Sequence, residues 1–201
     1  KQAERFNRPV LFFVDTPGAF CGIEAEERGI SEAIARNLYE FSDLEVPTLT
    51  VITGEGGSGG ALGLTVANKI YMMENSTLSV ISPEGCASIL FKDSSKANEA
   101  ATSLKLTPYD LYELGIVDEI IPEKDDFESK PNDTFKKIEN MLYEDVSEYM
   151  LMNKKKLCDQ RYEKYRNIGF FEMAESNSTF PQTTTPQTNI FKKIGKIFGF
   201  K

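Results

Sequence analysis

Histidine is absent from this chain of 201 residues. It is the side chain most often used as a general base near neutral pH, and it is the commonest protein ligand for metal ions. A serine nucleophile activated by histidine is therefore excluded within this chain. We expect any catalysis to depend on other groups, and we expect no metal to be bound.

Cysteine is scarce, with three residues that lie far apart: Cys21, Cys86 and Cys158. No two of them form a C-x-x-C pair, so their spacing favours neither a zinc site nor a disulfide framework. Scattered thiols are typical of proteins in a reducing compartment. We therefore expect a cytoplasmic protein.

Membrane-spanning and targeting patterns are also missing. No apolar run approaches the roughly 20 residues that cross a bilayer, and residues 1–5 are polar, unlike a secretory signal peptide. The formal net charge of −8 argues against nucleic-acid binding. The length predicts one domain, although a strand-like run begins so early that we expect part of a larger domain to precede it.

The sequence does contain a regular alternation of apolar runs and helix-like segments. Short apolar runs predict strands at 10–14, 48–53, 70–73, 78–81 and 117–121. Helices are expected at 24–43 and 60–68, and from the start signals Ser82-Pro83 and Thr107-Pro108. This alternation predicts an α/β fold with a parallel sheet and crossover helices.

The last third of the chain changes character. After a core at 1–123, we expect a helical region over 124–175, in which residues 134–166 are largely helical. Residues 176–189 are rich in threonine, proline and glutamine, which is typical of a disordered linker. Residues 190–201 carry four lysines, no acidic residue and one apolar helical face, so weak membrane or partner contact is one hypothesis and an exposed frayed end is the other.

The densest motif is GEGGSGG at residues 54–60, with five glycines in seven positions after a strand. The pattern G-x-G-x-x-G would indicate dinucleotide binding with Glu74 as the ribose ligand, but the motif is weak and the following helix is short. The pattern G-x-S-x-G would make Ser58 a nucleophile, but such a serine needs a base, normally histidine. A serine–lysine variant remains formally open.

A third interpretation of this stretch is an oxyanion hole. A loop without side chains that opens a helix exposes backbone N–H groups, and the helix dipole adds positive charge there. Glycine also lets a substrate approach the backbone itself. Such donors stabilise a negative oxygen without a titrating side chain, which suits a protein without histidine. The simpler alternative is that the glycines only permit tight packing of the strand on the helix.

A second short motif, Asp15-Thr16-Pro17-Gly18, resembles the switch element of a GTPase. A GTPase also needs the run G-x-x-x-x-G-K-[ST], whose backbone and lysine cradle the phosphates. The chain has no such run, and no lysine directly follows the glycine-rich stretch. The sequence therefore does not predict a GTPase.

Four long segments together resemble the carboxyltransferase α subunit of bacterial-type acetyl-CoA carboxylase. They are, in chain order, DTPGAFCGIEAEERGISEAIARNL, GEGGSGGALGL, MENSTLSVISPEGCASILFKDS and LYELGIVDEIIPE, and the resemblance is continuous over about residues 3–123. It implies a crotonase-like fold of repeated ββα units, with oxyanion holes at helix N-termini. The family's α subunits carry a further stretch ahead of this region, so we expect the core to be N-terminally truncated.

The resemblance also implies an activity. A carboxyl group passes from carboxybiotin, carried on the biotin carboxyl carrier protein, to acetyl-CoA, giving malonyl-CoA in the first committed step of fatty acid synthesis. The implied partners are the carboxyltransferase β subunit, in an α2β2 assembly, the carrier protein and biotin carboxylase. No cofactor is expected on this chain, and zinc is expected on the β subunit only. The alternative is a non-catalytic α-like fragment that acts in subunit or membrane binding.

Site residues follow from the same resemblance. The adjacent glycines Gly59 and Gly60 match the family's donors to the biotin oxygen, and are the expected catalytic residues. The other residues of the expected carboxybiotin slot are Gly56, Gly57 and Ser58 in the same loop, and Gly18, Ala19 and Phe20 on a facing wall. For Ala19 and Phe20 the alternative is plain packing in the core.

Overall fold

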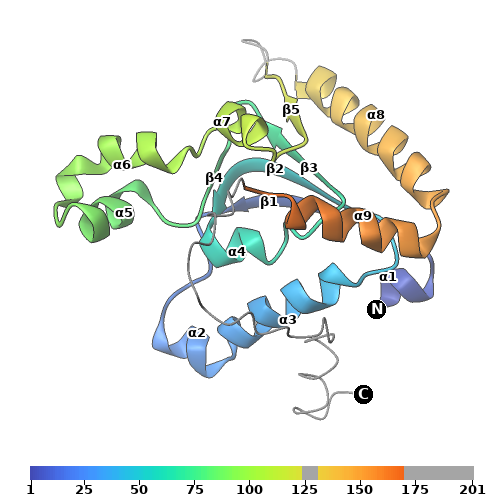
Figure 1. Cartoon of the computed structure of the whole chain (residues 1–201), viewed down its shortest axis with the longest axis horizontal. Coiled ribbons are helices and arrows are strands. Elements are labelled where there is room, and N and C mark those ends of the chain that lie inside the picture. Colours follow the sequence, from blue (N-terminus) through green and yellow to red (C-terminus); the bar gives the residue numbers. More distant parts are fainter. Residues whose placement is uncertain (124–130, 170–201) are drawn as a thin grey trace, which may run out of the picture. The chain divides into compact units, whose positions relative to one another are not determined.

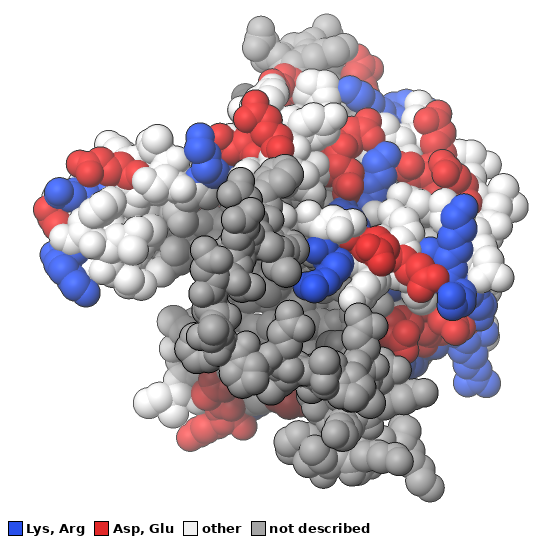
Figure 2. Space-filling model, in the orientation of Figure 1, with Lys and Arg blue, Asp and Glu red and all other residues white. Residues whose placement is uncertain are grey.

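A computed structural model describes residues 1–123 and 131–169 of the chain. The expected linker at 176–189 and the expected amphipathic tail at 190–201 lie outside the described residues, so both stay predictions. None of the described helices has both the length and the apolar character needed to cross a membrane. On the face shown in Figure 2, acidic and basic side chains intermingle rather than gathering into one basic patch.

The described residues form a parallel sheet whose main path runs β1-β2-β3-β5. Its strands are β1 (Val10–Thr16), β2 (Thr48–Gly57), β3 (Lys69–Met73), β4 (Thr77–Ser79) and β5 (Glu119–Ile121). The long strand β2 pairs with β3 along its first half and with β4 along its last three residues. Every pairing is parallel, which confirms the predicted sheet (Figure 1).

Helices connect β1 to β2, β2 to β3 and β4 to β5, as predicted, whereas a short turn joins β3 to β4; two of the helices differ in extent from the prediction. The connecting helices are α2 (Ile23–Glu27), α3 (Ile30–Ser42), α4 (Ser58–Leu62), α5 (Pro83–Leu90), α6 (Ala97–Leu104) and α7 (Pro108–Glu113), with α1 (Gln2–Arg5) ahead of β1 and a 3-10 turn at Ser94–Lys96. The single helix predicted over 24–43 is wrong, because Gly29 adopts φ +80° and separates α2 from α3. The helix predicted over 60–68 ends at Leu62, and the Leu64 carbonyl instead accepts a hydrogen bond from Thr50.

Both predicted helix start signals are confirmed. The Ser82 hydroxyl accepts a hydrogen bond from Gly85 N at 3.1 Å, and the Thr107 hydroxyl accepts one from Asp110 N at 3.3 Å. Each side chain satisfies an amide that the first turn of a helix leaves without a partner.

The prediction that residues 134–166 are largely helical is confirmed, and the structure divides the region into two helices. They are α8 (Pro131–Met150) and α9 (Lys154–Arg166). The chain leaves helical geometry at residues 151–153, and Asn153 starts α9 by accepting a hydrogen bond from Lys155 N at 2.9 Å. An asparagine in this position offers the backbone a new helix start, which the apolar periodicity alone does not reveal.

The sheet is covered on two faces. On one face, Val14, Ile52 and Met72 pack with Ala61 of α4 and Leu111 of α7. On the other face, the core contains Leu49, Val51, Tyr71 and Ile121 of the strands with Ile138 and Leu142 of α8. The central strand β2 is therefore buried on both sides (Figure 1), whereas the edge strand β1 leaves Phe13 58% exposed.

Candidate functional site

The glycine-rich stretch forms the junction between β2 and α4. Gly56 and Gly57 end the strand, and Ser58 begins the helix with φ +47°, in the left-handed region that residues other than glycine rarely adopt. Such a conformation persists only where the surrounding structure holds it. The strained junction therefore depends on neighbours that fix the loop from outside.

The neighbour on one side is the loop that follows β1. A Cβ atom added to Gly57 would lie 2.1 Å from the Pro17 carbonyl oxygen, and one added to Gly60 would lie 2.8 Å from Ala19 N. The two loops thus touch backbone to backbone, with no room for a side chain between them. The structure brings the predicted facing wall against the predicted donor loop.

The facing loop has its own internal support. Gly18 adopts φ +136°, and its N–H donates to the Thr16 hydroxyl at 3.2 Å. Phe20 leaves this loop with 71% of its surface exposed. The alternative that Phe20 simply belongs to the core is therefore wrong for this side chain.

The predicted donors lie in the first turn of α4. Ser58, Gly59 and Gly60 open this helix, and no side chain caps it. The first amides of an α-helix have no partner within the helix, so these N–H groups are available to an acceptor. On its other side Gly59 faces α3, because a Cβ atom there would lie 3.3 Å from Ile34 Cδ1. The glycine loop is therefore packed between the residue 17–19 backbone and α3.

Asp15, which opens both the DTPG motif and the first family-like segment, also lies at this site. Its carboxylate accepts a hydrogen bond from Glu55 N at 2.9 Å, and the pairing register of β1 with β2 shifts between Val14 and Thr16. A Cβ atom on Gly54 would lie 2.5 Å from the same carboxylate oxygen. An acidic residue at the carboxyl end of a strand, beside a glycine at the end of the next, was the signal available in the sequence.

Ionisable groups are few around these two loops. Within residues 15–20 and 54–60 only Asp15 and Glu55 carry a charge. In the part of the chain that the structure describes, no three cysteine, aspartate or glutamate side chains gather as a metal site would require. The arrangement can therefore offer backbone hydrogen-bond donors to a negative oxygen, with little competing side-chain chemistry.

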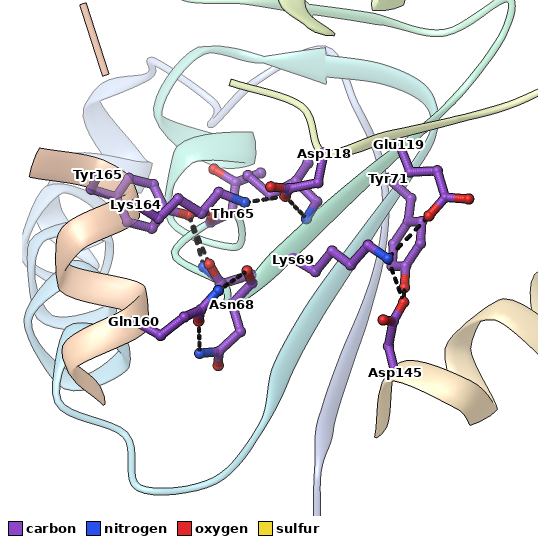
Figure 3. Close-up of polar contacts among 12 residues, drawn as sticks. Thr65, Asn68, Lys69, Tyr71, Asp118, Glu119, Asp145, Gln160, Lys164 and Tyr165 are labelled. Atoms are coloured by element: carbon purple, nitrogen blue, oxygen red, sulfur yellow. Dashed lines mark hydrogen bonds and ion pairs between the residues drawn. The ribbon is translucent and has the colours of Figure 1, made fainter. Parts of the chain in front are cut away.

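The opposite, amino-terminal edge of the sheet is built from side chains, which the sequence analysis did not single out (Figure 3). Lys69 of β3 bonds Asp145 of α8 at 2.7 Å and Glu119 of β5 at 3.0 Å. Burial tends to lower the pKa of Lys69, but these hydrogen bonds prevail and the pKa lies above its usual value. The Tyr71 hydroxyl also bonds Asp145, so α8 is tied to the sheet by a shared carboxylate.

Helix α9 is tied to the same edge. Asn68 donates to Gln160 Oε1 at 2.6 Å, and Lys164 forms an ion pair with Asp118. The Tyr165 hydroxyl accepts from Ala67 N at 2.8 Å and donates to the Thr65 carbonyl. Burial raises the pKa of Tyr165 to about 12, because the phenolate would lose its hydration there.

The family model described as acetyl co-enzyme A carboxylase carboxyltransferase-like matches residues 1–169. The acetyl-coenzyme A carboxylase carboxyl transferase subunit alpha of Oceanobacillus iheyensis is 52% identical over 172 residues, covering 85% of this chain and 54% of the relative. Its counterpart in Bacillus cytotoxicus is 54% identical over 172 residues, covering 84% and 52%. The chain thus spans about half the length of these curated relatives.

Two solved structures share the fold at low sequence identity. A Pseudomonas malonate decarboxylase hetero-tetramer in complex with coenzyme A is 17% identical with a TM-score of 0.66, covering 80% of this chain and 64% of that chain. A transcarboxylase 12S structure is 24% identical with a TM-score of 0.56, covering 89% and 31%. The predicted crotonase-like α/β fold is confirmed. The match over residues 1–169 shows that the chain belongs to the acetyl-coenzyme A carboxylase carboxyltransferase-like family.

Proposed function

We propose that this chain provides the α part of an acetyl-CoA carboxylase carboxyltransferase. It would take the carboxyl group from carboxybiotin on a biotin carboxyl carrier protein and pass it to acetyl-CoA, giving malonyl-CoA for fatty acid synthesis. Identity of 52% to a relative of that name supports the assignment. The observation that carries it is the backbone-to-backbone approach at Gly57 and Gly60, beside the uncapped first turn of α4.

The chemistry suits a site without histidine. When carboxybiotin releases its carboxyl group, negative charge is left on the ureido oxygen of biotin. The N–H groups of Gly59 and Gly60 would stabilise that charge, because preorganised donors act strongly where charge develops. The biotin anion can then take the proton from the acetyl methyl group. In this proposal no protein side chain has to act as the base.

The remaining site residues have supporting roles. Gly56, Gly57 and Ser58 would shape the donor loop, since their backbone sets where α4 begins. Gly18, Ala19 and Phe20 would form the facing wall of the carboxybiotin slot. The exposed ring of Phe20 suits contact with a substrate or a partner better than a role in the core of this chain.

The proposal includes partners and a compartment. We infer a β subunit that completes an α2β2 assembly and carries the zinc and most acetyl-CoA contacts, together with the carrier protein and biotin carboxylase. The core at 1–123 would hold the slot and the region at 124–175 would support it. Three scattered cysteines favour the cytoplasm.

The reverse reaction tests the proposal: decarboxylation of malonyl-CoA that depends on a soluble biotin derivative. The chain is assayed alone, with a β-type subunit, and with that subunit plus the sequence that the relatives carry beyond the matched region. Biotin-dependent turnover in either of the mixtures supports the α-subunit assignment, and the mixture that works shows how much sequence is needed. Absence of turnover in every mixture, despite assembly shown by size-exclusion chromatography, would favour a non-catalytic α-like protein.

A further inference from the structure

Arg161 of α9 is a buried cation whose described hydrogen-bond acceptors are all neutral. It is 1% exposed, and burial lowers its pKa from the usual arginine value. Its Nε finds no acceptor among the described residues. Taking a guanidinium out of water is costly unless its surroundings compensate it. The contacts of its terminal nitrogens show what the buried guanidinium stabilises.

Its terminal nitrogens hold the end of α3 and the connection that follows. One nitrogen donates to the Phe41 carbonyl at 2.8 Å and to the Leu44 carbonyl at 2.9 Å, and the other donates to the Val46 carbonyl at 3.1 Å. The C-terminus of a helix carries partial negative charge, which favours a cation there. Arg161 therefore fixes where α3 ends and how the chain enters β2.

Arg161 also fixes the start of β2 through Asn68. It donates to Asn68 Oδ1 at 2.7 Å, and the same oxygen accepts from Thr48 N, the first residue of β2, at 3.2 Å. Asn68 is held in turn by donating to the Leu157 carbonyl at 3.0 Å. One buried guanidinium thus joins the end of α3 to the beginning of β2.

Both of these elements border the glycine loop. Strand β2 ends at Gly57, where the loop begins. Helix α3 places Ile34 3.3 Å from the position of a Gly59 Cβ atom, and two turns later its Phe41 ring meets Phe12 of β1 edge to face at 5.1 Å. A shift of α3 along or about its axis would be transmitted to Gly59, because Ile34 packs beside it in a close-packed interior.

We propose that Arg161 is a positioning residue for the amide donors of the glycine loop, acting through α3 and β2. The inference rests on the proposed function of that loop. Donors of an oxyanion hole act only when they lie at hydrogen-bond distance from the developing charge. A misplacement of roughly 1 Å by a change far from the chemistry can reduce the rate about 100-fold.

The test compares Arg161→Lys with Leu157→Ala in the full chain bound to a β-type subunit. Lysine keeps the charge but cannot reach the separate carbonyls of α3 and β2 together. Leu157 is equally buried one turn earlier in α9, at 2% exposure, so its truncation weakens the same helix while the guanidinium contacts stay. We expect Arg161→Lys to lower kcat of the reverse reaction about tenfold or more, with KM for the soluble biotin derivative within about twofold. Leu157→Ala should keep kcat within about twofold at a temperature where both variants are folded.

A second readout is amide hydrogen exchange at residues 59–63. Arg161→Lys should speed exchange there, and Leu157→Ala should not. Equal effects of the two variants, or an unchanged kcat in Arg161→Lys, would overturn the proposal.

If Arg161→Lys fails to fold, Ile34→Val takes its place, since it removes the methyl group beneath Gly59. It should lower kcat severalfold, and an unchanged kcat would contradict the proposal. A wild-type complex without biotin-dependent turnover would contradict the proposed function instead, and amide exchange would then decide on Arg161.

Discussion

The two ends of strand β2 are built in opposite ways. At its carboxyl end the strand is followed by glycines, which have no side chains. Gly57 and Gly60 there lie directly against the backbone of residues 17–19. At its amino end, Thr48 is held by the buried side chains of Asn68 and Arg161. Side chains are missing at the end where we propose that a substrate approaches the backbone, and they are dense at the end that fixes the strand.

The two ends also differ in which part of the chain supplies the contacts. The carboxyl end is met by residues about 40 positions earlier, as in the bond from Glu55 N to Asp15. The amino end is met by α9, and the bond from Arg161 to the Val46 carbonyl spans 115 positions. The end where we propose chemistry is thus contacted by nearby sequence, and the distant helix α9 contacts the other end of the same strand. Substitutions at each end should therefore have different effects.

Gly60→Val should have the largest effect, on activity. Its Cβ atom would lie 2.8 Å from Ala19 N, so the facing loop has to move and the donor loop loses its geometry. We expect biotin-dependent turnover to fall by at least about 10²-fold, the usual cost of losing one oxyanion donor, while assembly with the β-type subunit persists. Gly63→Ala in the same segment is the milder comparison and should lower turnover far less, because its Cβ atom would lie 3.3 Å from the Gly59 carbonyl oxygen, which a small shift relieves. Full turnover in Gly60→Val would remove the oxyanion assignment.

Asn68→Leu should have the largest effect on stability. It takes partners from Thr48 N and from the Arg161 guanidinium in a site where Asn68 is 1% exposed. Leaving buried polar groups unpaired should lower the free energy of unfolding by about 3 kcal/mol, measured by urea denaturation. Asn98→Leu on the exposed face of α6 should change it by less than about 0.5 kcal/mol. A loss as small as the control's would mean that the amino end is not held by this network.

Alkaline pH should loosen the amino end. Burial raises the pKa of Tyr165 to about 12 from its usual value near 10, so the folded state favours the protonated hydroxyl. Its contribution to stability is complete below pH 10 and is lost as the pH rises from 10 to about 12. In Tyr165→Phe the unfolding midpoint should fall less steeply as the pH rises. Part of the fall should remain, because the pKa of Tyr149 is also raised to about 12. Tyr162→Phe, at a 60% exposed position of α9, should leave the pH profile as it is, and an equal flattening there would refute the assignment.

Ser82→Ala should have the smallest effect, because it concerns neither end of β2. The lost hydrogen bond from Gly85 N should cost about 1 kcal/mol of unfolding free energy. Biotin-dependent turnover per folded molecule should stay within twofold of wild type, as for a site away from the two loops. A large loss of turnover would show that α5 takes part in the slot.

The sequence predicted the carboxyl end of β2 far better than the amino end. Apolar runs located the strands, and the glycine density together with the family resemblance pointed to Gly59 and Gly60. These signals are local in the chain. Asp15 had no role of its own in the prediction from sequence, because its bond to Glu55 N depends on how β1 and β2 pair in the fold.

The amino end escaped prediction for a physical reason. A charged residue in a helix is normally predicted to be solvent-exposed. The sequence therefore did not indicate that Arg161 would be only 1% exposed. Its acceptors are mainly backbone carbonyls, which every residue possesses and no sequence pattern marks. The break at Gly29 was missed likewise, since an isolated glycine in a helical pattern is often tolerated.

The central claim is that the amides of Gly59 and Gly60 donate to the biotin oxygen. The most direct test observes these two amides by NMR. The chain, labelled with ¹⁵N-glycine, is bound to an unlabelled β-type subunit, and its 14 glycines give few enough signals to assign. On adding a soluble biotin derivative, we expect the amide signals of Gly59 and Gly60 to shift, while those of Gly29 and Gly115 stay in place. Unmoved Gly59 and Gly60 signals in a complex that turns over malonyl-CoA with the same derivative would contradict the account.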